Sequence, residues 1–253
     1  MSNPIKSQFI SVLAMIPSLF VFYTAFPQSS KITAEEIIDK CIETHGHEKF
    51  KEIHLEFTFR DYDYMLHRDK LQTIYSRKTK VDPLTITDVY PLKKRLKRKI
   101  NGQEIELADS LAQKFQTSLN SVMYFVELPN KLKDPTVITE YLGEKIINDD
   151  SYHVLKISFD PYSNDDHQDE YRYWINSKTF TMDYFAYSFQ VDGGGTRFRK
   201  AINRREIKGV VFQDYENYRP IEKYVPLDTI PDLLIEGKLL MVSLIEKRNI
   251  SLH

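Results

Sequence analysis

The sequence contains only one cysteine, Cys41, so the chain can form no internal disulfide bond. Cys41 follows Asp39 and Lys40 well downstream of the apolar N-terminal run, so it is not placed as the lipid-attachment cysteine of a lipoprotein. It recurs with Ile38 and Ile42 at helical spacing, which favours a small buried hydrophobic side chain.

Glycine, proline and net charge are also low. Eight glycines and eleven prolines in 253 residues argue against low complexity and general disorder. The formal net charge of −1 gives no electrostatic reason to expect nucleic acid as a partner. The hydrophobic fraction of 42% is enough for a substantial core, and no linker is visible, so we expect a single domain over residues 31–253.

The sequence motifs of several enzyme and metal-site classes are missing. The chain has no Gly-x-Ser-x-Gly, Ser-x-x-Lys, His-Glu-x-x-His or Gly-x-Gly-x-x-Gly pattern and no EF-hand loop. These absences favour a binding protein over an enzyme. They do not exclude catalysis, because a catalytic pair assembled from distant residues leaves no local pattern.

The N-terminus resembles a secretory signal. Lys6 precedes a mostly apolar run over residues 9–26, and a polar stretch follows. Tyr23 stands where a small residue is needed for cleavage after Ala25, and the run is about as long as the shortest membrane span. Residues 1–30 are therefore predicted to be a cleaved signal peptide or an uncleaved anchor. Either one predicts a periplasmic or secreted protein of the cell envelope.

Residues 137–190 are typical of four successive antiparallel strands. In the second strand Leu155, Ile157 and Phe159 share one face, which is the period-two pattern of a half-buried strand. The third and fourth strands form a hairpin over Asn176-Ser177-Lys178. This arrangement is a meander and not a βαβ unit.

Helices flank these strands in the sequence. Thr33 and Glu36 form a capping box, and Gly46 supplies the left-handed position that ends the first helix. Apolar spacing predicts a second helix between Asp109 and Glu127, and a short helix near Asp228. Further strands are predicted over residues 53–60, 61–67, 71–80, 84–89, 92–100, 196–202, 210–219 and 239–250. The order predicts an α+β fold in which a large curved antiparallel sheet packs around one or two helices.

Several segments carry a family resemblance. The segments Ile32–Lys40, His45-Gly46, Tyr141–Glu144, Tyr152–Ile157 and Tyr173–Thr179 together resemble the LolA/LolB-like lipoprotein-localisation superfamily. That resemblance implies a half-barrel whose apolar concave face, closed by helices, holds acyl chains. The chain also resembles a family of uncharacterised exported bacterial proteins, through the segments Asp166–Asp169, Asp183–Ser188 and Asp192–Arg199. This second resemblance implies no particular chemistry.

An acidic loop is the densest group of candidate ligands. Asp166, His167 and Asp169 lie close together in the sequence, and such side chains can bind Ca²⁺ or Zn²⁺. The same pattern also fits a solvated surface loop. A third reading is catalysis by a metal-dependent or His/Asp hydrolase-like site centred on His67, His167 and Asp169.

Arginines and tyrosines are the candidate ligand-binding residues. Arg197 and Arg199 follow three consecutive glycines on one predicted strand face and could bind a carboxylate or phosphate, although a wide turn explains the glycines equally well. The strand tyrosines Tyr64, Tyr171, Tyr173 and Tyr187 could line an amphipathic cavity or simply pack across strands. His67 belongs to the same candidate set.

A basic run over residues 93–99 could contact a membrane surface, or could protect an edge strand from aggregation.

Together these patterns predict an exported binding or carrier protein for a lipid or other amphipathic small molecule, held on the concave face of the sheet. Its predicted partners are that ligand, and a membrane surface or envelope proteins, but not nucleic acid. We expect no obligatory cofactor.

Overall fold

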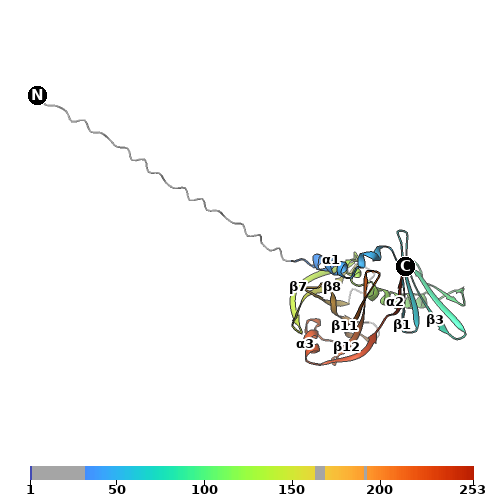
Figure 1. Ribbon diagram of the computed structural model, residues 1–253. Helices are drawn as coiled ribbons and strands as arrows, with labels where there is room; N and C mark the ends of the chain where they lie inside the picture. Colours follow the sequence, from blue (N-terminus) through green and yellow to red (C-terminus); the bar gives the residue numbers. More distant parts are fainter. Residues whose placement is uncertain (2–31, 163–168, 191–192) are drawn as a thin grey trace. The chain divides into compact units, whose positions relative to one another are not determined.

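In the described residues, antiparallel strands form two sheets of seven strands each. The computed structural model describes Met1 and residues 32–162, 169–190 and 193–253 (Figure 1). The first sheet, in the order β14-β1-β2-β3-β4-β5-β6, contains β1 (Ile53–Phe59), β2 (Tyr62–Arg68), β3 (Thr73–Val81), β4 (Leu84–Pro91), β5 (Lys97–Ile100), β6 (Gln103–Ile105) and β14 (Arg248–Leu252). The second, in the order β13-β12-β11-β10-β9-β8-β7, contains β7 (Val137–Ile147), β8 (Asp150–Phe159), β9 (Glu170–Asn176), β10 (Met182–Phe189), β11 (Gly195–Ile207), β12 (Val210–Pro220) and β13 (Leu239–Ile245).

Few helices accompany the sheets in the part of the chain that the structure describes. They are α1 (Ala34–Thr44), α2 (Asp109–Val126), α3 (Ile230–Ile235) and the 3₁₀ helices η1 (His47–Lys51), η2 (Asn130–Lys133) and η4 (Leu227–Thr229). The predicted capping box begins α1, since the Glu36 N–H donates to Thr33 Oγ1 at 3.2 Å and the Thr33 N–H donates to Glu36 Oε2 at 2.8 Å. Gly46 has the predicted left-handed conformation, with φ of 64°. The α+β class with extensive antiparallel sheet is confirmed.

Three apolar clusters hold these layers together. The first lies between the first sheet and α2, which contributes Leu119, Met123 and Val126. The second lies on the inner face of the second sheet and is covered by α1, by η2 and by Phe125 of α2. Helix α2 therefore packs against both sheets, and Figure 1 shows it between them. A third cluster covers the other face of the second sheet beneath η4 and α3.

The strand faces follow the period-two prediction. Tyr173 and Trp174 are adjacent in β9 and both fully buried, yet Tyr173 belongs to the inner cluster and Trp174 to the outer one. Successive side chains of a strand point to opposite faces, so a strand covered on both sides is buried along its whole length. The middle of the second sheet is therefore a fully buried layer.

The predicted last strand is wrong in its extent. Residues 239–250 do not form one strand, because β13 ends at Ile245 in the second sheet and β14 begins at Arg248 in the first. The intervening Lys247 is fastened by its N–H, which donates to Asp214 Oδ1 at 2.9 Å. The chain therefore crosses from one sheet to the other at this point.

The basic run also differs from its prediction as an edge strand. Only residues from Lys97 onward form β5, which pairs with both β4 and β6 and so is not an edge. Strand β6 was not predicted. Arg98 makes ion pairs with Asp88 and stacks over Phe115 at 3.5 Å, so part of the run's charge is neutralised inside the fold.

Within the part of the chain that the structure describes, no helix combines the length and the apolar character needed to cross a membrane.

Candidate ligand-binding site

A cavity of about 990 Å³ lies where α2 meets both sheets. One wall is a face of α2, another comes from β1, and the remainder comes from β10 to β13 and the crossing to β14. Its lining is Phe57, Phe59, Arg60, Ser110, Gln113, Lys114, Thr117, Ser118, Ser121, Val122, Phe125, Val126, Phe185, Tyr187, Arg199, Tyr215, Ile245 and Lys247.

Aromatic rings form the floor of the cavity. Phe57 comes from β1, Phe125 from α2 and Phe185 from β10, and the rings of Phe125 and Phe185 stack with centroids 5.6 Å apart. Tyr187 extends this surface, 5.7 Å from Phe125. Such rings present a broad apolar contact area, and the Tyr187 hydroxyl adds a polar point to it.

Arg199 of β11 projects into this aromatic surface. Its Nη2 donates to the Tyr187 hydroxyl at 2.9 Å, and its guanidinium lies 5.4 Å from the Phe125 ring centroid. Its Nε is buried and has no hydrogen-bond partner in the described structure. No ion pair of Arg199 with a described carboxylate is found. The guanidinium thus contacts aromatic rings and a neutral hydroxyl, and no described carboxylate forms an ion pair with it.

Lys247 supplies a second cation from the crossing between the sheets. Its side chain is 9% exposed, and its Nζ donates to the carbonyl oxygen of Gln213 at 2.5 Å. The nearest carboxylate oxygen, Asp214 Oδ1, lies 4.0 Å away and also accepts from Arg205 Nη2 at 3.1 Å. Burial lowers the pKa of Lys247 to about 8. The negative charge of Asp214 raises this pKa, and the positive charges of Arg205 and Arg199 lower it further.

Two of the predicted ligand-binding residues, Tyr187 and Arg199, line the cavity. Tyr171 and Tyr173 are buried in the inner cluster of the second sheet, where the hydroxyls of Tyr173 and Tyr124 lie 3.3 Å apart. Tyr64 is buried in the first cluster. These three tyrosines pack the core, so the structure does not bring them to the cavity.

Arg197 and His67 also lie away from the cavity lining. Arg197 stacks over Phe189 at 5.0 Å, and its Nη1 donates to the carbonyl oxygen of Thr196 at 2.9 Å. His67 pairs with His54 across β2 and β1, on the face of the first sheet opposite Leu66, and contacts Asp69 at 3.2 Å. It therefore points away from the core that α2 covers.

The predicted metal site falls largely outside the described residues. Asp166 and His167 lie there, while Asp169 immediately precedes β9. Among the residues that the structure does describe, no three His, Cys, Asp or Glu side chains are arranged to hold a metal ion. The Ca²⁺ or Zn²⁺ site remains a prediction. His67 lies in β2 of the first sheet, whereas Asp169 immediately precedes β9 of the second, so the hydrolase-like alternative gains no geometric support.

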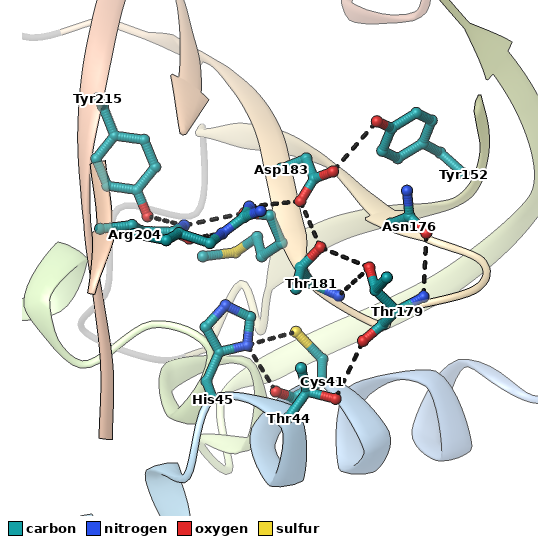
Figure 2. Close-up of polar contacts among 12 residues, drawn as sticks. Cys41, Thr44, His45, Tyr152, Asn176, Thr179, Thr181, Asp183, Arg204 and Tyr215 are labelled. Atoms are coloured by element: carbon teal, nitrogen blue, oxygen red, sulfur yellow. Dashed lines mark hydrogen bonds and ion pairs between the residues drawn. The ribbon is translucent and has the colours of Figure 1, made fainter. Parts of the chain in front are cut away.

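A second polar cluster lies between α1 and the strands of the second sheet (Figure 2). Cys41 Sγ lies 3.7 Å from His45 Nδ1, which also contacts the Cys41 carbonyl oxygen at 2.8 Å. Across from them, Arg204 pairs with Asp183, and Asp183 accepts from the Tyr152 hydroxyl at 3.2 Å.

The Cys41–His45 pair of this second cluster is sealed from solvent, whereas Arg204 is 34% exposed. Cys41 is fully buried and His45 is 1% exposed. Burial raises the pKa of the Cys41 thiol, and burial likewise lowers the pKa of His45, so both groups are held neutral. A neutral, inaccessible thiol is a poor nucleophile. We therefore assign this cluster to anchoring α1 on the second sheet.

Sequence reasoning missed Lys247 and the polar face of α2. Lys247 lies between Glu246 and Arg248, a pattern that reads as an exposed turn. Likewise, Gln113, Thr117 and other polar residues of α2 read as a solvated helix face, whereas in the fold they form a wall of the cavity. No local signal in the sequence distinguishes these cases.

Solved structures and a family model place the chain among known proteins. A LolA superfamily protein from Nitrosomonas europaea is 13% identical, with a TM-score of 0.50 over 88% of this chain and 94% of that one. A DUF1329 family protein from Desulfovibrio piger is 8% identical, with a TM-score of 0.38 over 85% and 91% of the two chains. At these identities the first likeness confirms the predicted LolA-like fold alone. A search of the curated proteins finds no significant match. The model of a family of unknown function, DUF6503, matches residues 16–247, and the chain therefore belongs to that family.

Proposed function

We propose that this protein binds a lipid or another amphipathic small molecule in the cavity between its two sheets. The observation that carries the proposal is the cavity itself, of about 990 Å³, with aromatic rings and cationic groups in one lining. Small-molecule sites typically enclose about 300–1,000 Å³ and combine an apolar lining with a few placed polar groups. Affinity would come from burying apolar ligand surface against Phe57, Phe125 and Phe185.

The proposal includes the cell envelope as the place of action. Residues 1–30, predicted as an export signal or anchor, would direct the domain formed by residues 31–253 to the periplasm or outside the cell. There the protein would take up its ligand from a membrane surface or from an envelope protein. The pattern of the sequence supports this location, and detection of the protein in fractionated cells tests it.

Native mass spectrometry of the protein purified from its own cell envelope tests the binding function. We expect an added mass that denaturation releases as an amphipathic molecule. A protein that carries no small molecule, and that binds no fatty acid or phospholipid when these are added, would contradict the proposal.

A pair of tryptophan variants on α2 separates cavity binding from adhesion to the surface. Ser121 lines the cavity, whereas Leu111 lies on the same helix, is 45% exposed and does not line it. We expect Ser121→Trp to fill the cavity and to lose the bound molecule, and Leu111→Trp to retain it. Equal retention by both folded variants would place the ligand elsewhere.

A further inference from the structure

The cavity has a one-sided distribution of charge. Arg60, Lys114, Arg199 and Lys247 line it, and none of the described residues in its lining is acidic. The whole chain, by contrast, has a formal net charge of −1. The positive lining is thus a local property of the cavity and not a reflection of the overall composition.

The four cations occupy two different environments. Arg60 and Lys114 are exposed, so water screens them and their charge needs no partner. Arg199 and Lys247 lie deeper, against the aromatic floor and the crossing between the sheets. A cation removed from water costs free energy unless an opposite charge or hydrogen bonds compensate it.

Arg199 lacks that compensation in the described structure. Its one described side-chain hydrogen-bond partner is the neutral hydroxyl of Tyr187, at 2.9 Å, and its buried Nε makes no hydrogen bond. The guanidinium has five N–H donors in a planar fork that matches the oxygens of a carboxylate or phosphate. A ligand oxyanion in the cavity would satisfy donors that the protein leaves unused.

Lys247 lines the same cavity as Arg199. The charge of Arg199 contributes to lowering the pKa of Lys247, so the two cations repel each other inside one cavity. Asp214 is 4.0 Å from the Lys247 ammonium, but both of its oxygens also accept from Arg205. An anion between Arg199 and Lys247 would relieve this repulsion.

We propose that the ligand of this cavity carries an oxyanion, a carboxylate or a phosphate, which binds Arg199 and Lys247 while its apolar part lies on the aromatic floor. This inference rests on the proposed function, since it names the class of amphiphile that the cavity selects. It assigns to Lys247 a recognition role that the sequence pattern does not suggest.

Amphiphiles with one tail and different heads test the inference. Dodecanoate, dodecyl phosphate, dodecanol and dodecyltrimethylammonium would be titrated into the full protein with calorimetry as the readout. The ionic amphiphiles are kept below their micelle concentrations and dodecanol below its solubility limit. We expect the two anions to bind at least about tenfold more tightly than dodecanol, and the cation to bind most weakly. Tighter binding of the phosphate or of the carboxylate identifies which oxyanion the cavity prefers.

Three variants assign the effect to residues. Arg199→Gln and Lys247→Gln should each weaken binding of the preferred anion about tenfold or more and change dodecanol binding less than about twofold. Arg197→Gln is the matched control, because Arg197 precedes Arg199 by two residues on the same strand face and does not line the cavity. Circular dichroism confirms that each variant folds.

The outcomes separate the two proposals. If all four amphiphiles bind with equal affinity, and the variants change none of them, the cavity binds amphiphiles but the oxyanion inference is wrong. If none of the four binds, the proposed function fails with it. Equal loss of anion binding in Arg197→Gln and Arg199→Gln would also overturn the assignment, because it would indicate general surface charge.

Discussion

Arg68 and Glu127 form a partly buried ion pair that holds the C-terminal end of α2 to β2, with Nη2 and Oε2 2.6 Å apart. The Glu127 side chain is 2% exposed and also accepts from the Tyr75 hydroxyl. A carboxylate at the end of a helix is unfavourable next to the helix dipole, so Arg68 compensates both the burial and the dipole. The pair holds α2, and with it one wall of the cavity, against the first sheet.

Glu127→Gln should therefore destabilise the protein by about 2–3 kcal/mol, because it leaves the partly buried Arg68 guanidinium without a carboxylate. Urea unfolding measures this change. Asp39→Asn is the control, since Asp39 pairs with Lys133 on the surface with exposed fractions of 53% and 42%. The control should change the free energy of unfolding by less than about 1 kcal/mol. Equal effects would show that burial of the Glu127 pair does not matter.

Gly46 should not tolerate a side chain. It has φ of 64° between α1 and η1, and a Cβ there would lie 1.9 Å from the carbonyl oxygen of Gly209. We expect Gly46→Ala to lower stability by roughly 3 kcal/mol or more, because left-handed strain adds to a backbone clash. Gly102→Ala is matched for conformation, with φ of 84° and no atom within 4 Å of its Cβ, and should cost about 1 kcal/mol. Thermal unfolding of the two variants gives the comparison.

His47 should make the protein sensitive to acid. Burial lowers its pKa to about 3, the nearby His45 adds to this, and hydrogen bonds to the backbone at Val211 and Glu127 oppose it. Between pH 6.5 and 3 the unfolded chain binds a proton that the folded one does not. The free energy of unfolding therefore decreases as the pH is lowered, by roughly 1.4 kcal/mol per pH unit.

His47→Gln removes this titration and can still donate to the Val211 carbonyl. We therefore expect the difference in unfolding free energy between the wild type and this variant to shrink from pH 7.5 to pH 5. Denaturant unfolding at the two pH values provides the measurement. A difference that does not depend on pH would contradict the assignment to His47.

Lys247 should make stability rise with pH in the same direction as His47, but in an alkaline window. Its pKa is lowered from 10.5 to about 8 in the fold, so above pH 8 the folded protein loses this proton before the unfolded chain does. The unfolded state then binds more protons, and stability rises with pH by roughly 1.4 kcal/mol per unit up to the unfolded pKa. Relative to Lys247→Gln, the wild type should gain stability from pH 7.5 to pH 9.5. If the wild type gains nothing relative to the variant, Lys247 is not buried as a cation.

Much of the local structure could be predicted from the sequence. Three local features are confirmed: the shared face of Leu155, Ile157 and Phe159 in β8, the capping box at Thr33 and the left-handed glycine at position 46. Each depends on interactions within a few residues. The half-buried character predicted for β8 is wrong, because residues 152–155 are all buried. The alternation of side chains along a strand also separates Tyr64 from His67, which were both predicted to bind the ligand. Tyr64 and His67 are three apart on one strand, so period two places them on opposite faces, and the structure does so.

The amino-acid sequence by itself determined the α+β class, the faces of the strands and the positions of the helices, because these follow from spacing and from neighbours along the chain. Only the tertiary structure decided that Arg199 and Lys247 share a cavity, that the polar face of α2 forms its wall, and that residues 239–250 divide between two sheets. These relationships join segments far apart in the sequence. They depend on how apolar faces pack together, which no local pattern records.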